Sequence, residues 1–165
     1  MSLKPFILYT FAIADTAGVS GAANVFISVF NAANSVKVIG MLALNIESYA
    51  VGAASVGSSM CVYRTTAASG GSLISASAVH KLDTLHPNPV AEIRIENPSI
   101  TVSGNTIRGF APAVTSGVGG GAAISAAPPG SAPFLLYPGQ GLAFRTADGD
   151  VDHRWNMSVV WTEVP

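Results

Sequence analysis

Residues 24–46, NVFISVFNAANSVKVIGMLALNI, contain two apolar segments separated by a short polar cluster. Segments 24–31 and 36–46 are rich in β-branched and aromatic residues, and the Asn-Ala-Ala-Asn-Ser between them has the composition of a turn. The alternation of side chains within VFISVF favours a strand over a helix. This stretch therefore predicts two successive β-strands joined by a turn.

The rest of the chain continues in the same pattern of short strand-like segments and turns. Further strands are expected at 60–66, 90–97, 132–139, 141–148 and 153–164, with 73–82 as another candidate. Residues 99–110 predict either one strand or a hairpin about Ser103-Gly104-Asn105. Turns are expected at 67–71 and at the proline-rich 86–89. Because no segment holds a helical period over ten residues, the sequence predicts an all-β chain, a single antiparallel β-sandwich of jelly-roll type with nine or so strands.

Length and alternation define the expected domain organisation. The 165 residues suffice for one domain with a substantial core. Segment 90–97 places the charged Glu92, Arg94 and Glu96 on the opposite side from Ala91, Ile93 and Ile95, as expected for a strand with one exposed face. We expect residues 1–20 to form an N-terminal arm or edge strand, and residues 21–165 to form the sandwich.

The chain carries unusually little charge. Only 10% of its residues are charged and 49% are hydrophobic, against about 25% charged in an average soluble domain. Residues 109–144 contain no Asp, Glu, Lys or Arg at all. Such a protein is expected to cover part of its outside with lipid, with copies of itself or with another protein.

Two classes of partner are disfavoured by the sequence. The run 109–144 is interrupted throughout by Gly and Pro, and segment 16–36 contains Asn, Ser and Gly, so neither predicts a membrane span. The net charge of −1 and the scattered arginines give no basic patch for nucleic acid. Protein contact is the remaining explanation, and the Gly/Ala-rich 117–127 is expected to pack against a neighbouring copy or a symmetry axis.

The chain offers few candidates for chemistry. Asp148, Asp150 and Asp152 have the alternate spacing of a Ca²⁺-binding loop, but the glycine and glutamate that complete an EF-hand loop are absent. A solvated turn is the favoured interpretation of this segment, with a metal role as the alternative. No nucleophile elbow or phosphate loop is present, so we expect no catalytic residues and no cofactor. The single Cys61 cannot form an intrachain disulfide.

Trp155 and Trp161 lie at even spacing in the last expected strand and so share one face of it. Core or interface packing is the favoured role for both side chains. A platform on which a sugar ring stacks is the alternative.

Several phrases of the sequence resemble a family of small β-sandwich proteins that decorate or cement the virions of tailed bacteriophages. The resemblance is carried by VFISVFNAANSVKVIGMLAL, by YRTTAASGGSLISASAVHKLDTLHPNP, by LLYPGQGLAFRT and by the terminal WNMSVVWTEV, within residues 24–164. It implies a structural protein of the capsid surface whose partners are its own copies, in a trimer by analogy, and the major capsid protein or another virion protein.

The expected function is therefore a non-enzymatic capsid decoration or cement module that assembles through apolar contacts. The candidate interface residues are Phe6, Leu8, Phe11, Val118, Ile124, Phe134, Trp155 and Trp161. The alternative is a carbohydrate- or receptor-binding head of a viral fibre or surface protein, favoured by the Trp pair and by the Asp-rich turn at 148–152.

Overall fold

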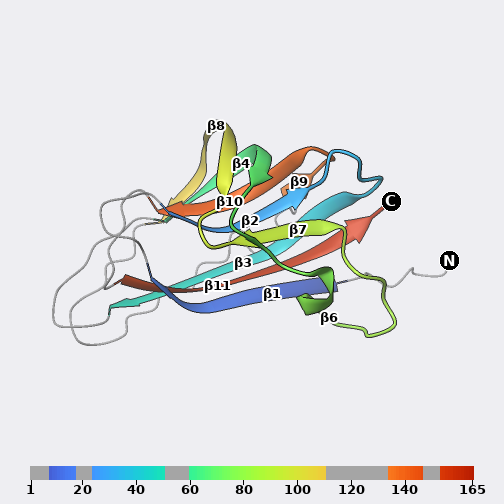
Figure 1. The fold of residues 1–165 in the computed structure, drawn as a ribbon, viewed down its shortest axis with the longest axis horizontal. Helices are drawn as coiled ribbons and strands as arrows, with labels where there is room; N and C mark the ends of the chain where they lie inside the picture. The colour runs from blue at the N-terminus through green and yellow to red at the C-terminus, as the bar shows by residue number, and fades with distance from the viewer. Residues whose placement is uncertain (1–7, 18–23, 51–59, 111–133, 147–152) are drawn as a thin grey trace.

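Two antiparallel β-sheets pack face to face in this protein (Figure 1). The computed structural model describes residues 8–17, 24–50, 60–110, 134–146 and 153–165. One sheet has the strand order β6-β1-β11-β3-β9, and the other has the order β5-β7-β2-β10-β4-β8. The strands are β1 Leu8–Ala17, β2 Val25–Asn31, β3 Val38–Ala50, β4 Met60–Ser69, β5 Ser72–Leu73, β6 His80–Lys81, β7 Ala91–Ile95, β8 Ser99–Phe110, β9 Phe134–Leu136, β10 Gln140–Thr146 and β11 His153–Val164; a 3-10 helix, η1, spans Ala76–Ala78.

Eight of these strands have the pairing of a jelly roll. The first strand pairs with the last, β1 with β11, and the nested pairs β2 with β10, β3 with β9 and β4 with β8 follow. All four pairs are antiparallel, as in a long hairpin rolled into two sheets. The segment between β4 and β8 adds β5 and β7 beside β2 and adds β6 beside β1. The predicted all-β sandwich of jelly-roll type is confirmed.

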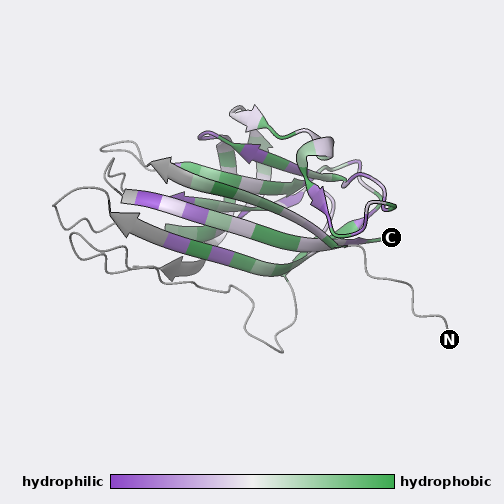
Figure 2. Ribbon diagram, turned by 90° about the horizontal axis from the view of Figure 1, so that it is seen from below, coloured by the Kyte–Doolittle hydropathy of each residue, from purple (hydrophilic) through white to green (hydrophobic). Residues whose placement is uncertain are grey.

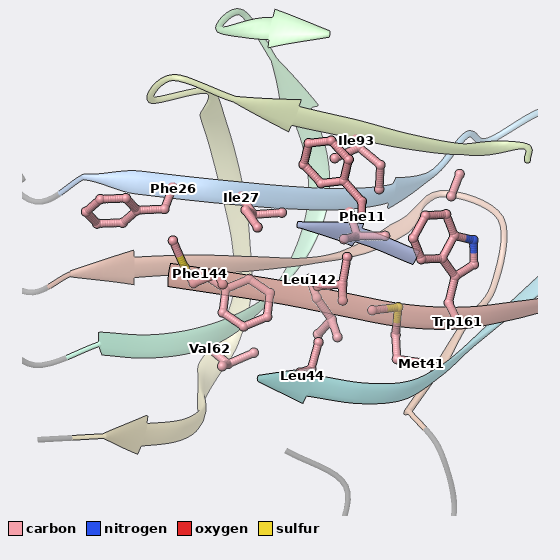
Figure 3. Close-up of a cluster of buried hydrophobic side chains, with 14 of the residues drawn as sticks. Phe11, Phe26, Ile27, Met41, Leu44, Val62, Ile93, Leu142, Phe144 and Trp161 are labelled. Atoms are coloured by element: carbon pink, nitrogen blue, oxygen red, sulfur yellow. The ribbon is translucent and has the colours of Figure 1, made fainter. Parts of the chain in front are cut away.

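The core lies between the two sheets and follows the alternation of the strands. Along β11, Trp155, Met157, Val159 and Trp161 are buried, while the residues between them point outward. Leu142 and Phe144 from the opposite sheet project into the same interior (Figure 3). Burying this set of aromatic and branched side chains is the main favourable contribution to folding.

Two local expectations differ from the structure, and for a third segment the structure decides between the two predicted alternatives. Segment 73–82 is not one strand, because η1 separates the short β5 from β6. The turn expected at 67–71 is confined to Gly70 and Gly71, which have positive φ, and β4 continues to Ser69. Residues 99–110 form one strand, β8, in which Gly104 has φ +79° and marks a bulge against β4 rather than a hairpin.

The Pro138-Gly139 turn connects two strands of different sheets. Both strands expected on either side of it are present as β9 and β10. However, β9 is an edge strand beside β3, whereas β10 lies between β2 and β4. Asn31 holds the turn in place, because its carbonyl oxygen accepts a hydrogen bond from the Gly139 amide and its Nδ2 donates to the Leu136 carbonyl oxygen.

The described part of the N-terminal region is a strand of the sandwich. β1 lies between β6 and β11, and its Tyr9 and Phe11 side chains belong to the core. The strand therefore shares the interior of the domain. Residues 1–7 and 18–23 lie outside the described residues.

Candidate assembly surface

The structure places the expected interface residues in three different settings. Phe11, Trp155 and Trp161 are buried between the sheets with at most 8% of their surface exposed. The interface role expected for these three is wrong, because such side chains offer no surface to a partner. Phe134 is half-buried and packs against the core, and Leu8 is half-buried on the outer side of β1. Phe6, Val118 and Ile124 lie outside the described residues, as do Asp148, Asp150, Asp152 and the segment 117–127.

Both tryptophans are engaged in aromatic packing inside the domain. Trp161 stacks on Tyr9 with ring centroids 5.6 Å apart, and Trp155 lies 6.3 Å from Phe26 in a tilted arrangement. The two side chains share one face of β11, as predicted, and that face is the core. Neither ring is available for stacking on a sugar, so the alternative of a carbohydrate-binding head loses its support from the Trp pair.

The outer side of the sheet formed by β1, β11 and β3 carries both apolar and polar side chains, with the charged ones confined to one end. We call this surface the β1–β11–β3 face, with the edge residue Leu135 of β9 included. Its outward side chains are Leu8, Thr10, Ala12 and Ala14 of β1, Val38, Gly40, Leu42, Ala43, Asn45 and Glu47 of β3, and Arg154, Asn156, Ser158, Val160, Thr162 and Val164 of β11. Figure 2 looks onto this face, and apolar residues gather toward the end of β11 near the C-terminus.

The strand register arranges these side chains in rows across the face. One row contains Leu8, Thr162, Gly40 and Leu135, and the Thr162 methyl group packs so closely over Gly40 that a side-chain carbon there would lie 3.2 Å from it. A central row contains Thr10, Val160 and Ala43, with His80 of β6 at its margin.

The other rows become more polar with distance from the C-terminus. In one of them, Ala12, Ser158 and Asn45 lie side by side, and Asn45 Nδ2 donates to Ser158 Oγ at 3.1 Å. Among the outward side chains that the structure describes, the charged Glu47 and Arg154 lie still farther along the strands. The centre of the face is therefore free of charge and made of small or branched side chains.

A shallow hollow opens in the more polar half of this face. It has a volume of about 200 Å³ and a mainly apolar surface, lined by Ala12, Ile13, Ala14, Asn45, Glu47, Asn156, Met157 and Ser158. A bulge in β1 after Ile13 adjoins it. Pockets that bind small molecules usually measure about 300–1,000 Å³, so the hollow is small for a ligand.

Exposed apolar side chains also surround the end of the sandwich at which β11 finishes. Among the described residues, seven large hydrophobic side chains are well exposed, and six of them belong to segments at this end (Figure 1): Val36, Leu82, Leu85, Leu135, Tyr137 and Val164. Hydrogen bonds of Asn31 Nδ2 to the carbonyl oxygens of Lys37 and Leu136 join the loops that carry Val36 and Tyr137. Large exposed apolar areas of this kind mark sites of protein contact.

The outer side of the other sheet has a different character. Arg94 and Glu92 form an ion pair at 3.5 Å on β7, and Arg94 also donates to the Gly70 carbonyl oxygen. The Ser72 hydroxyl of β5 donates a hydrogen bond to the Glu96 carboxylate. The charged face predicted for 90–97 is thus present on β7.

A buried carboxylate holds the two sheets together at the apolar end. Glu163 Oε1 accepts hydrogen bonds from the amides of Val90 and Ala91 at 2.7 and 3.0 Å and from Trp161 Nε1 at 3.3 Å. Its Oε2 lies 3.2 Å from Lys37 Nζ. Each carboxylate oxygen therefore has a donor. These hydrogen bonds offset the cost of burying the charge, so the carboxylate has a structural role in joining the two sheets.

Tyr9 belongs to the same cluster. Its hydroxyl donates to the Pro87 carbonyl oxygen at 3.1 Å. Burial raises the pKa of Tyr9, and the negative charge of Glu163 raises it further.

Sequence reasoning did not identify the outward residues of this face, Val160, Leu42 and Val38 among them. The alternation in 153–164 separates two sets of side chains, but both sets contain apolar residues, so the pattern does not decide which set is inside. The greater size of Trp155 and Trp161 is the one signal that could have assigned them to the core.

The described residues contain no group of three His, Cys, Asp or Glu side chains placed to hold a metal ion. In the same part of the chain, no helix has the length and apolar character needed to cross a membrane. Comparison with family models, with curated proteins and with solved structures gives no match to this chain.

Proposed function

We propose that this protein is a non-enzymatic structural component of a tailed-phage virion, a capsid decoration or cement module. In this role it is held on the capsid surface by contacts with its own copies and with the major capsid protein or another virion protein. The observation that carries the proposal is the group of exposed apolar side chains at the end of β11, together with the uncharged centre of the β1–β11–β3 face.

The character of this surface supports assembly over solution chemistry. Apolar side chains exposed on a free monomer, such as those of Val36, Leu135 and Tyr137, promote aggregation unless a partner covers them. The sandwich itself has a complete core of its own, so the outer apolar residues are not needed for folding. Their burial against a neighbouring subunit gives them a physical role.

The composition supports the same function. A module that tiles a shell is surrounded by protein on several sides, which relaxes the usual demand for charged surface. The chain has 10% charged residues and a net charge of −1, so copies packed side by side do not repel one another strongly. The sequence phrases that resemble virion decoration proteins agree with this role.

The proposal is tested on purified particles of the phage that encodes the chain. Quantitative mass spectrometry is expected to find the protein in many copies per particle, in a fixed ratio to the major capsid protein. Cryo-electron microscopy of the same particles is expected to show a jelly roll on the outer shell. Particles that lack the protein, or that contain it in traces, would refute a structural role in the virion.

A further inference from the structure

We infer that Lys37 and Asn31 become joined by an isopeptide bond, formed within the folded chain with Glu163 as the base. The three side chains meet at the apolar end of the sandwich, where β2 ends and β3 begins. The reaction takes place once per chain and modifies the chain itself, so it requires no substrate from outside. This bond does not depend on the proposed role in the virion.

The strand register brings the three residues together in the interior. Asn31 is the last residue of β2 and is fully buried, and it pairs with Ala91 of β7. Lys37 directly precedes Val38, the first residue of β3. Glu163 of β11 has a fully buried side chain and accepts a hydrogen bond from the amide of the same Ala91 at 3.0 Å. The asparagine and the carboxylate thus adjoin one residue of β7, although they belong to different sheets.

Lys37 provides the nucleophile. Its Nζ lies 3.2 Å from Glu163 Oε2. A lysine amine attacks a carbonyl carbon when it is neutral, and a carboxylate at hydrogen-bond distance is placed to take its proton. In an apolar interior, the neutral amine and carboxylic acid are less costly to bury than the two ions. The amides of Val90 and Ala91 and Trp161 Nε1 hold the other carboxylate oxygen, which keeps Oε2 directed at the lysine.

The side-chain amide of Asn31 provides the carbon that is attacked. Its Nδ2 donates to the carbonyl oxygens of Lys37 at 2.8 Å and of Leu136 at 2.9 Å. Because an amide C–N bond measures about 1.3 Å, Asn31 Cγ lies within about 4 Å of the Lys37 carbonyl oxygen. The long lysine side chain can fold back from its own backbone to reach this carbon.

The other atom of this amide is also unusual. Asn31 Oδ1 is buried and has no hydrogen-bond partner among the described residues. Buried acceptors without a donor are uncommon in folded proteins, and each one calls for a physical reason. Once Glu163 has taken the proton of the lysine, it becomes a donor beside Asn31, and Oδ1 is the oxygen on which negative charge develops during the attack.

The reaction balances without a further reagent. Glu163 takes one proton from the Lys37 ammonium group, and the neutral Nζ forms a bond to Asn31 Cγ. A second proton passes from Nζ to Nδ2, and the Cγ–Nδ2 bond breaks. Ammonia leaves and takes the proton held by Glu163, which restores the carboxylate. One carbon–nitrogen bond forms, one breaks, and nothing is oxidised. The lysine side chain is 24% exposed, which gives the product a route to solvent.

Mass spectrometry of the intact full-length chain tests the bond directly. The wild-type protein is expected to be lighter than its sequence requires by the mass of one ammonia molecule. Trypsin cleaves after a lysine only when the amine is free. A tryptic digest of the denatured chain is therefore expected to lack cleavage after Lys37 and to yield a peptide that continues to Arg64, with residues 31 and 37 joined.

Substitutions separate the roles of the amine and the base. Lys37→Arg keeps the positive charge beside Glu163 but removes the attacking amine, so this variant is expected to have its full mass. Glu163→Gln removes the base and is also expected to retain the ammonia. Asn45→Ala and Glu47→Gln, at exposed positions of β3, are the matched controls and are expected to lose ammonia as the wild type does. If Glu163→Gln fails to fold, the wild type and Lys37→Arg still decide the result.

The other outcomes overturn the inference. A wild-type chain of full mass shows that no bond has formed. A chain that has lost ammonia but is still cleaved after Lys37 contains an asparagine that has cyclised onto its own backbone. Loss of water in place of ammonia would put the new bond on Glu163. None of these results bears on whether the protein is found in virions, which the particle analysis decides independently.

Discussion

At the residue scale, Glu163 is the polar side chain on which the packing of the apolar end most depends. Glu163→Gln removes the negative charge beside Lys37 and places an amide group among donors, so at least one hydrogen bond to the carboxylate is lost. We expect the free energy of unfolding to fall by about 2–4 kcal/mol, as for other buried ion pairs that lose one partner. Urea denaturation followed by tryptophan fluorescence measures this change.

Glu47→Gln is the matched control for that substitution. Glu47 is exposed on the outer side of β3, and a surface change of this kind usually alters stability by about 0.5 kcal/mol or less. Equal losses in the two variants would contradict the structural role assigned to the Glu163 carboxylate.

The raised pKa of Tyr9 predicts a specific loss of stability in alkaline solution. The folded state holds the Tyr9 proton more tightly than the unfolded state does, because of burial and then of the Glu163 charge. This contribution is fully present below the ordinary tyrosine pKa of about 10, and it is lost as the pH rises through the higher pKa of the folded state. The free energy of unfolding is thus expected to decline above about pH 10.

The variant Tyr9→Phe tests the assignment of this alkaline decline. It lacks the titrating hydroxyl. Its free energy of unfolding is therefore expected to fall less steeply than that of the wild type as the pH rises from neutral to values above the ordinary tyrosine pKa. It also loses the hydrogen bond to Pro87, so it starts from a lower stability at neutral pH. Parallel curves for the two proteins would show that Tyr9 is not responsible.

At the element scale, the connection between β4 and β5 depends on a glycine. Gly71 has φ +57°, and a side-chain carbon there would collide with the Ile95 carbonyl oxygen and the Pro98 backbone. Gly71→Ala is expected to lower the free energy of unfolding by about 3 kcal/mol or more. The alanine side chain disfavours the left-handed backbone conformation, and its Cβ collides with neighbouring backbone atoms. Thermal and urea unfolding measure the loss.

Gly104 in β8 separates these two effects. It also has a positive φ, of +79°, but no atom lies within 4 Å of the position a side-chain carbon would take. Gly104→Ala is expected to cost about 1–2 kcal/mol from the backbone conformation alone. A loss in Gly104→Ala as large as that in Gly71→Ala would contradict the collision at Gly71.

At the scale of the whole molecule, the apolar outer face predicts that folding and association are coupled. If a second copy covers the β1–β11–β3 face, the midpoint of thermal unfolding rises with protein concentration. This rise is expected to persist in high salt, because apolar contacts are not screened as surface ion pairs are. Val160→Glu, which places a charge in the middle of the β1–β11–β3 face, is expected to abolish the dependence on concentration. Thr101→Glu, at an exposed position of β8 in the other sheet, is the control and is expected to retain it.

Much of the fold could be predicted from local patterns in the sequence. The segment 24–46 and the alternation in 90–97 specify strands because side chains in a strand alternate between two environments. The final strand was predicted as 153–164 and lies at those residues. The division of 73–82 by η1 could not be predicted in this way, because β5 and β6 are two residues each and depend on pairing with β7 and β1.

The candidate site was less accessible to sequence reasoning. The low charge of the chain predicts a surface covered by protein. Three of the predicted interface residues, Phe11, Trp155 and Trp161, are instead buried in the core. Large aromatic side chains serve cores and interfaces equally well. The less conspicuous Val160 and Ala12 lie on the outer side of the sheet instead.

The sequence by itself determined that this protein is all-β, poor in charge and without a motif for catalysis, because these properties follow from local alternation and composition. Only the tertiary structure decided which side of each strand faces the core. The nested pairing of β1 with β11 and β2 with β10 brings together residues more than a hundred positions apart. Local patterns carry no information on such contacts, and these contacts distinguish the buried Trp161 from the outward Val160 beside it.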